Sequence, residues 1–264
     1  MQDYEKQWPG LDIKHLVIST DSFIVWVDPE LDVDWATNDS FDKDGPKDEA
    51  AHHQILNRAA SIECIPIEHI SETVRLSFKR MLGEGIARSL EHDYENAKKM
   101  LDSAEAFIQA RNGELARSWY LSGSFRTAGL AIIAGLVLWL IRDYAVPFLG
   151  QTLFDLMIAS VAGATGALLS VIMRMGDATL DSAAGRNMHL LESASRIVAG
   201  MISAIVVASA IKADLIFPIF SKLSCPQVAI VLAGLVAGSS ERLAPSIIRK
   251  IESKTEDTDK KPEE

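Results

Sequence analysis

The sequence lacks the residue patterns that most enzyme active sites require. It has two cysteines and six histidines in 264 residues, with no zinc-type cysteine pair and no H-E-x-x-H motif. A G-x-S-x-G motif and a phosphate-binding glycine loop are also missing. We therefore expect a protein that is not an enzyme and that holds no cofactor or metal.

Charged residues are absent from four long stretches of the C-terminal half: residues 127–141, 156–173, 197–211 and 223–240. A helix rises about 1.5 Å per residue and a membrane core is about 30 Å thick, so roughly 20 apolar residues span it. Two of the stretches contain 18 residues, and apolar neighbours extend the other two. A soluble helical core is the alternative, which four such stretches within 115 residues disfavour. We predict a mainly α membrane protein with about four transmembrane helices.

A secretory signal peptide is also missing, because MQDYEKQWPG has neither a basic start nor an apolar run. Residues 1–117 are therefore expected on the cytoplasmic side, and four spans return the C-terminus to that side. Nine basic residues then flank the inner ends of the spans and three flank the outer ends, as the positive-inside rule requires. Cys64 and Cys225 would lie on opposite sides and should not pair.

The region before the spans is predicted to be a small α+β domain. Residues 1–66 are acidic, since residues 1–50 hold thirteen Asp and Glu against four Lys. Residues 15–34 contain β-favouring runs that predict one or two strands, and residues 35–49 have the composition of a loop. The acids of this loop could suggest calcium, but the D-x-D-x-D-G register would need acids at Ser40 and Ala51.

Residues 67–117 show helical periodicity and lead directly into the first span. Ser71 can cap a helix, and Gly83 and Gly85 are predicted to interrupt it. A narrow apolar seam follows, which either packs on the N-terminal strands or pairs with another subunit as a coiled coil. We predict that this seam couples the cytoplasmic domain to the membrane through Ile86, Leu90, Leu101 and Ile108.

The spans of residues 118–245 carry rows of small residues at spacings of four. Helices in lipid associate through close backbone approach, which such residues permit. These rows could pack helices within one subunit or between subunits. The glycines predicted to pack the helices are Gly163, Gly166, Gly200, Gly234 and Gly238.

Ionisable residues follow the second and fourth spans. Charge at membrane depth usually faces an interior or a cavity, although a simple interfacial anchor is the alternative for each residue. Arg174 shares a helix face with Ser170, one turn deeper. The predicted pore or gate residues are Ser170, Arg174, Asp177, Glu241 and Arg242. Residues 246–264 are charged and are predicted to be a disordered tail.

Two stretches, GATGALLSVIMR from Gly163 to Arg174 and AGSSERLAP from Ala237 to Pro245, resemble a module of bacterial membrane effectors in anti-phage defence. The resemblance covers about half the chain, from Thr127 to Pro245. The layout is similar to that of the membrane subunit of the Hailong defence system. That resemblance implies an oligomeric ion channel in the bacterial inner membrane, held shut by a nucleic-acid ligand.

Our leading hypothesis is therefore a homo-oligomeric membrane effector whose cytoplasmic domain senses a nucleotide, a nucleic acid or a partner protein. A second hypothesis is a membrane-anchored scaffold that recruits cytoplasmic partners without conducting ions. A transporter is a third, which is weakened because the prolines of the apolar segments lie near span ends.

Overall fold

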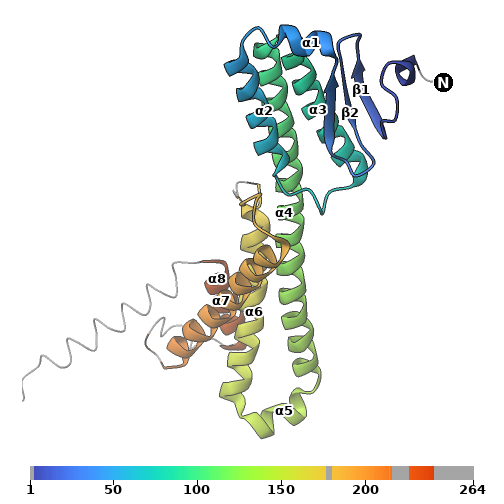
Figure 1. Ribbon diagram of the computed structural model, residues 1–264. Coiled ribbons are helices and arrows are strands. Elements are labelled where there is room, and N and C mark those ends of the chain that lie inside the picture. Colours follow the sequence, from blue (N-terminus) through green and yellow to red (C-terminus); the bar gives the residue numbers. More distant parts are fainter. Residues whose placement is uncertain (1–2, 177–179, 214, 216–225, 241–264) are drawn as a thin grey trace, which may run out of the picture. The chain divides into compact units, whose positions relative to one another are not determined.

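The computed structural model describes residues 3–176, 180–213, 215 and 226–240, and Figure 1 shows the order of its elements. The chain divides into two compact units, Met1–Leu115 and Ala116–Glu264, which we call unit 1 and unit 2. The prediction of a mainly helical chain with a small strand-containing N-terminal part is confirmed.

Unit 1 begins with the short helix η1 (Asp3–Lys6) and an antiparallel sheet in the order β1 (His15–Ser19), β2 (Phe23–Val27), β3 (Val33–Thr37). All five residues of β2 are buried. Two helices follow the sheet in a region that we predicted to be strands and loop: α1 (Asp39–Asp44) and α2 (Glu49–Glu63). Asn38 and Asp48 start them by accepting hydrogen bonds from backbone N–H groups three residues later.

Helix α3 (Glu72–Leu90) does not break at its glycines as predicted. Gly83 and Gly85 are buried positions of close approach: a Cβ at Gly83 would lie 2.9 Å from Val17 of β1, and one at Gly85 would lie 2.7 Å from Leu101. The helix ends instead at a turn over residues 91–93, where His92 has a φ of 63°. That turn divides the predicted seam between two helices.

Helix α4 (Tyr94–Leu140) is a single helix of 47 residues, drawn as one unbroken ribbon in Figure 1. Its first part packs against α3, so Ile86 and Leu90 of α3 share one buried core with Leu101 and Ile108 of α4. The strands contribute Phe23 and Val25 to the same core. Of our two interpretations of the seam, packing within the N-terminal unit is therefore the one observed.

Unit 2 contains the rest of α4, followed by α5 (Arg142–Leu149), α6 (Gln151–Arg174), α7 (Arg186–Lys212) and α8 (Pro226–Ser239). Three of the described helices, α4, α6 and α7, are long and apolar enough to cross a membrane. Helix α8 is apolar but has only 14 residues, and the preceding part of the predicted fourth span lies outside the described residues. Helices α6, α7 and α8 all pack against one another.

Candidate functional site

The predicted packing glycines bring α6, α7 and α8 into backbone contact. A Cβ at Gly163 would lie 2.5 Å from the Gly200 carbonyl oxygen, and one at Gly238 would overlap the carbonyl oxygen of Gly163. A Cβ at Gly200 would lie 3.3 Å from the Gly238 carbonyl oxygen. We call Gly163, Gly200 and Gly238 the glycine junction. These rows of small residues therefore pack helices within one subunit.

Two further glycines extend the contact between α6 and α8. A Cβ at Gly166 would overlap the Leu235 carbonyl oxygen, and one at Gly234 would lie 2.7 Å from the Ala159 carbonyl oxygen. No side chain separates the helices at these positions. The centre of this three-helix cluster is consequently closed by backbone atoms.

A small cavity of about 220 Å³ opens beside the glycine junction. Gly200 and Gly238 of the junction belong to its wall. Its lining also includes three serines and one arginine: Ser170 of α6, Arg196 and Ser203 of α7, and Ser240 after α8. We call this the inner cavity. Its donors suit an anion or water, because a hydroxyl and a guanidinium both donate hydrogen bonds.

The inner cavity differs from the predicted pore site in its charged residue. Ser170 lines it as the prediction requires, but Arg174, which ends α6 and is exposed, is not among its described lining residues. Arg196 supplies the positive charge instead. In the sequence, Arg196 is one of the nine basic residues near the predicted inner span ends. Asp177, Glu241 and Arg242 lie outside the described residues.

An ion pair that the sequence analysis missed joins α6 and α7 away from the glycine junction. Asp155 is buried, with 9% of its side chain exposed, and its Oδ2 lies 2.7 Å from the Lys212 Nζ. The Gln151 side chain donates to the other carboxylate oxygen at 2.7 Å. Two hydrogen bonds to the buried carboxylate compensate much of its lost hydration. Asp155 directly precedes one uncharged run and Lys212 directly follows another. This placement in the sequence could have predicted the ion pair.

A second unpredicted cluster lies between α4 and α7. His189 is buried, with its ring 6.2 Å from that of Trp119, and neither ring nitrogen has a hydrogen-bond partner among the described residues. The hydroxyl of Ser124 on α4 is also buried and likewise lacks such a partner. Each unsatisfied buried polar group costs about 1–3 kcal/mol. This contact is therefore less stable than an apolar one of similar shape.

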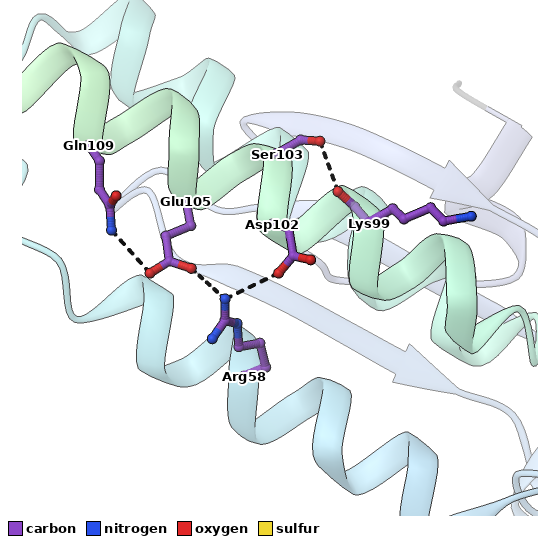
Figure 2. A network of polar contacts seen from close by, with 6 residues as sticks. All are labelled: Arg58, Lys99, Asp102, Ser103, Glu105 and Gln109. Carbon is purple, nitrogen blue, oxygen red and sulfur yellow. Dashed lines mark hydrogen bonds and ion pairs between the residues drawn. The ribbon is translucent and has the colours of Figure 1, made fainter.

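Ion pairs link two helices of unit 1 in addition to its hydrophobic core. Arg58 of α2 reaches two carboxylates of α4, Asp102 and Glu105, and Gln109 donates to Glu105 at 3.1 Å, as Figure 2 shows. These residues are partly exposed, so each pair contributes at most about 1 kcal/mol. Their main effect is to fix α2 against the first part of α4.

Lys79 is a buried cation of α3 that pairs with an acid at the end of α2 and with one just before β3. Its Nζ contacts Glu63 and lies 3.6 Å from Asp32. Asp32 also converges with Asp28 and Glu30, within 4.8 Å of one another. Burial, followed by repulsion from neighbouring acids, raises the pKa of Asp34 in β3. Because Lys79 already offsets part of this charge, the three acids, of which Glu30 and Asp32 are exposed, give no reason to assign a metal site.

The acids between residues 39 and 49 that could have suggested calcium have other positions. Asp39 and Asp42 lie in the first turn of α1, and Glu49 lies in the first turn of α2. Negative charge is favourable there because the helix dipole is positive at its N-terminus. Asp48 caps α2.

The chain matches no protein family, no curated protein and no solved structure.

Proposed function

We propose that this chain is the subunit of a homo-oligomeric membrane effector in the bacterial inner membrane, which conducts ions when unit 1 receives a cytoplasmic signal. Four spans cross the bilayer: the second part of α4, α6, α7 and the apolar run that contains α8. Both termini are cytoplasmic in this arrangement. The resemblance to anti-phage membrane effectors supports a role in defence, in which infection triggers loss of the membrane barrier.

The observation that carries this proposal is the continuity of α4. Residues 94–115 of this helix belong to unit 1, and residues 116–140 belong to unit 2. Ala97, Leu101 and Ile108 are buried in the core of unit 1. A rearrangement of that core therefore displaces the helix that enters the apolar part, with no intervening loop to absorb it. The seam residues Leu101 and Ile108 belong to this helix, so the coupling predicted for the seam stays a prediction and would run through α4.

The glycine junction supports an oligomeric pore rather than a passage through one subunit. Backbone atoms of α6, α7 and α8 are in contact at Gly163, Gly200 and Gly238, so an ion cannot pass between these helices. Conduction therefore needs faces of several subunits around a common axis. We propose that Arg174, exposed at the end of α6, and Arg196 lie near the inner end of that axis and favour anions over cations there.

The signal is expected to bind unit 1. The Hailong resemblance implies a nucleic acid that holds the channel shut, and a nucleotide or a partner protein would act at the same unit. Unit 1 forms its own core from sheet and helices, as a sensing domain requires. Binding or release of this signal at the core of unit 1 then changes the position of α4.

Conductance and mass measured on one preparation test this proposal. Purified protein in a planar bilayer should conduct, and its mass in detergent should be that of an oligomer. Under a salt gradient, Arg196→Glu and Arg174→Glu should shift the reversal potential toward cation preference, more strongly at low ionic strength. The control is Arg142→Glu at the start of α5, which should shift the reversal potential less.

Two results would contradict the proposal. A monomer without conductance that still inserts would favour the membrane-anchored scaffold. Protease cleavage of either terminus from outside intact spheroplasts would contradict the four-span topology. An unchanged reversal potential in both arginine variants would leave conduction standing but assign Arg174 and Arg196 to anchoring.

A further inference from the structure

Helices α4, α6 and α7 enclose an apolar groove of about 590 Å³ on the surface of unit 2. It lies apart from the inner cavity and shares no lining residue with it. Its wall is almost entirely aliphatic, and Ser160 is the one polar side chain among the described lining residues. Representative residues of the wall are Ala131, Ala134, Ile141, Leu153, Met157 and Ile205.

Small residues on one face of α4 create this groove. Ala131, Ala134 and Gly135 occur at spacings of three and four, so they lie on the same side of the helix. At Gly135 the two helices approach closely, since a Cβ there would lie 2.7 Å from both methyl groups of Val161 on α6. Leu153 and Met157 of α6 lie beside this strip of small residues, which is followed along α4 by Val137 and Leu138. The depression is therefore built into the sequence of α4.

The length of the groove matches one leaflet of a bilayer. Ala131 and Ile141 are ten positions apart, and at about 1.5 Å per residue the groove is about 15 Å long. A hydrocarbon core of about 30 Å gives about 15 Å for each leaflet. One extended acyl chain of a membrane lipid therefore fits along it.

A basic residue, Arg142, directly follows Ile141 in the chain at one end of the groove. Arg142 begins α5, and its guanidinium lies 5.2 Å from the centre of the Trp139 ring. Among the described residues its carboxylate neighbour is Asp143 at 3.6 Å, an exposed pair that leaves most of the five N–H donors of Arg142 available. Tyr144 and Phe148 of α5 are 84% and 88% exposed, as aromatic side chains are at a membrane interface. This end therefore has the chemistry of the headgroup layer.

We propose that this groove binds one phospholipid from the leaflet that adjoins α5. One acyl chain lies along α4 between Ile141 and Ala131, and a phosphate oxygen accepts hydrogen bonds from Arg142. The pairing of an apolar groove of one-leaflet length with a cation at its end selects a phospholipid over a second copy of this chain. The inference rests on the membrane insertion in our proposed function, but not on conduction.

Photolabelling tests the site on the full chain in nanodiscs. The discs contain phosphatidylcholine and phosphatidylglycerol, with a trace of phosphatidylglycerol that carries a diazirine on one acyl chain. Mass spectrometry should find the label on groove residues of α4, α6 and α7. Ala134→Phe fills the groove and should abolish this label. Ile133→Phe is the matched control, because Ile133 is 60% exposed and is not a lining residue.

Arg142→Gln should lower the yield of label at the groove without changing the melting temperature, since the exposed guanidinium holds the headgroup and not the fold. Groove label that persists in Ala134→Phe would overturn the proposal. Disulfide-linked dimers formed on oxidation of Ala134→Cys in a Cys64→Ser, Cys225→Ser background would also overturn it, because a second copy would then occupy the groove. Extraction of unmodified protein by alkaline carbonate would instead refute membrane insertion itself.

Discussion

Replacing Gly163 by alanine should separate α6 from α7 and lower the stability of unit 2. The new Cβ would lie 2.5 Å from the Cβ of Ala204 and from the Gly200 carbonyl oxygen. Carbon atoms in contact prefer about 3.5–4.0 Å, so the helices must move apart by about 1 Å. Overpacking of this kind costs about 1–3 kcal/mol. The same movement weakens the contact between Gly163 and Gly238, and so it disturbs α8 as well.

Alanine also has a better helix propensity than glycine, by about 1 kcal/mol, and a control must remove this effect. Gly129→Ala on α4 provides it, because no described atom outside its own helix lies within 4 Å of a Cβ at Gly129. Both substitutions add the same atoms to a helix, so their difference reports the packing cost alone.

Thermal unfolding of both variants in the same detergent measures this difference. Gly163→Ala should unfold at the lower temperature, by roughly 2–4 °C for each kcal/mol of packing cost in a chain of about this size. Gly129→Ala should equal or exceed the wild-type protein. A Gly163→Ala protein that unfolds at or above the temperature of Gly129→Ala would refute the glycine junction.

Three further predictions concern buried polar groups. Ser124→Ala should leave the melting temperature unchanged or raise it, whereas Ser89→Ala should lower it, because the Ser89 hydroxyl lies 2.9 Å from the Nδ1 of His52. Equal effects of the two changes would contradict this difference. Burial, and then the charge of nearby histidines, lowers the pKa of His52 from its ordinary 6.5. The contribution of His52 to the free energy of unfolding is therefore complete above pH 6.5 and is lost as the pH falls below 6.5. Chemical unfolding of the wild-type protein against pH should show this loss, and His52→Gln should flatten it; an unchanged pH profile in the variant would assign the loss to another group. Lys212→Met should destabilise unit 2 toward the lower end of about 3–5 kcal/mol, because it removes the cation paired with a buried carboxylate. Adding Asp155→Asn should recover much of the melting temperature, and additive losses in the double variant would contradict the ion pair.

The apolar helices of unit 2 could be predicted from sequence because long uncharged runs are rare in soluble chains. The small residues that pack them were also visible as rows at spacings of four. Which rows would meet could not be predicted, since Gly163 has the same local pattern whether it faces α7, α8 or another subunit. Which rows meet depends on how the three helices are rotated relative to one another. The residue spacing within one helix does not determine that rotation.

Unit 1 shows where local patterns mislead. Gly83 and Gly85 lower helix propensity, yet α3 continues through them because the sheet and Leu101 need the missing side-chain volume. The helix ends instead near His92, which has positive φ; histidine is enriched at such positions, but it is a much weaker turn signal than glycine. By contrast, Asn38 and Asp48 are residue types that commonly cap helices, so the starts of α1 and α2 could have been predicted. The acidic composition of the segment instead indicated a loop.

The continuity of α4 also sets an order of events during synthesis. The core of unit 1 needs residues up to Ile108, and the same helix reaches Leu140 only 32 residues later. At a translation rate of about 5–20 residues per second, this segment takes roughly 2–6 s to make. In the proposed topology, the N-terminal core therefore closes within seconds of the moment when the remainder of α4 enters the membrane. If the chain inserts as proposed, substitutions that slow the folding of unit 1 should appear in cells as poor membrane insertion.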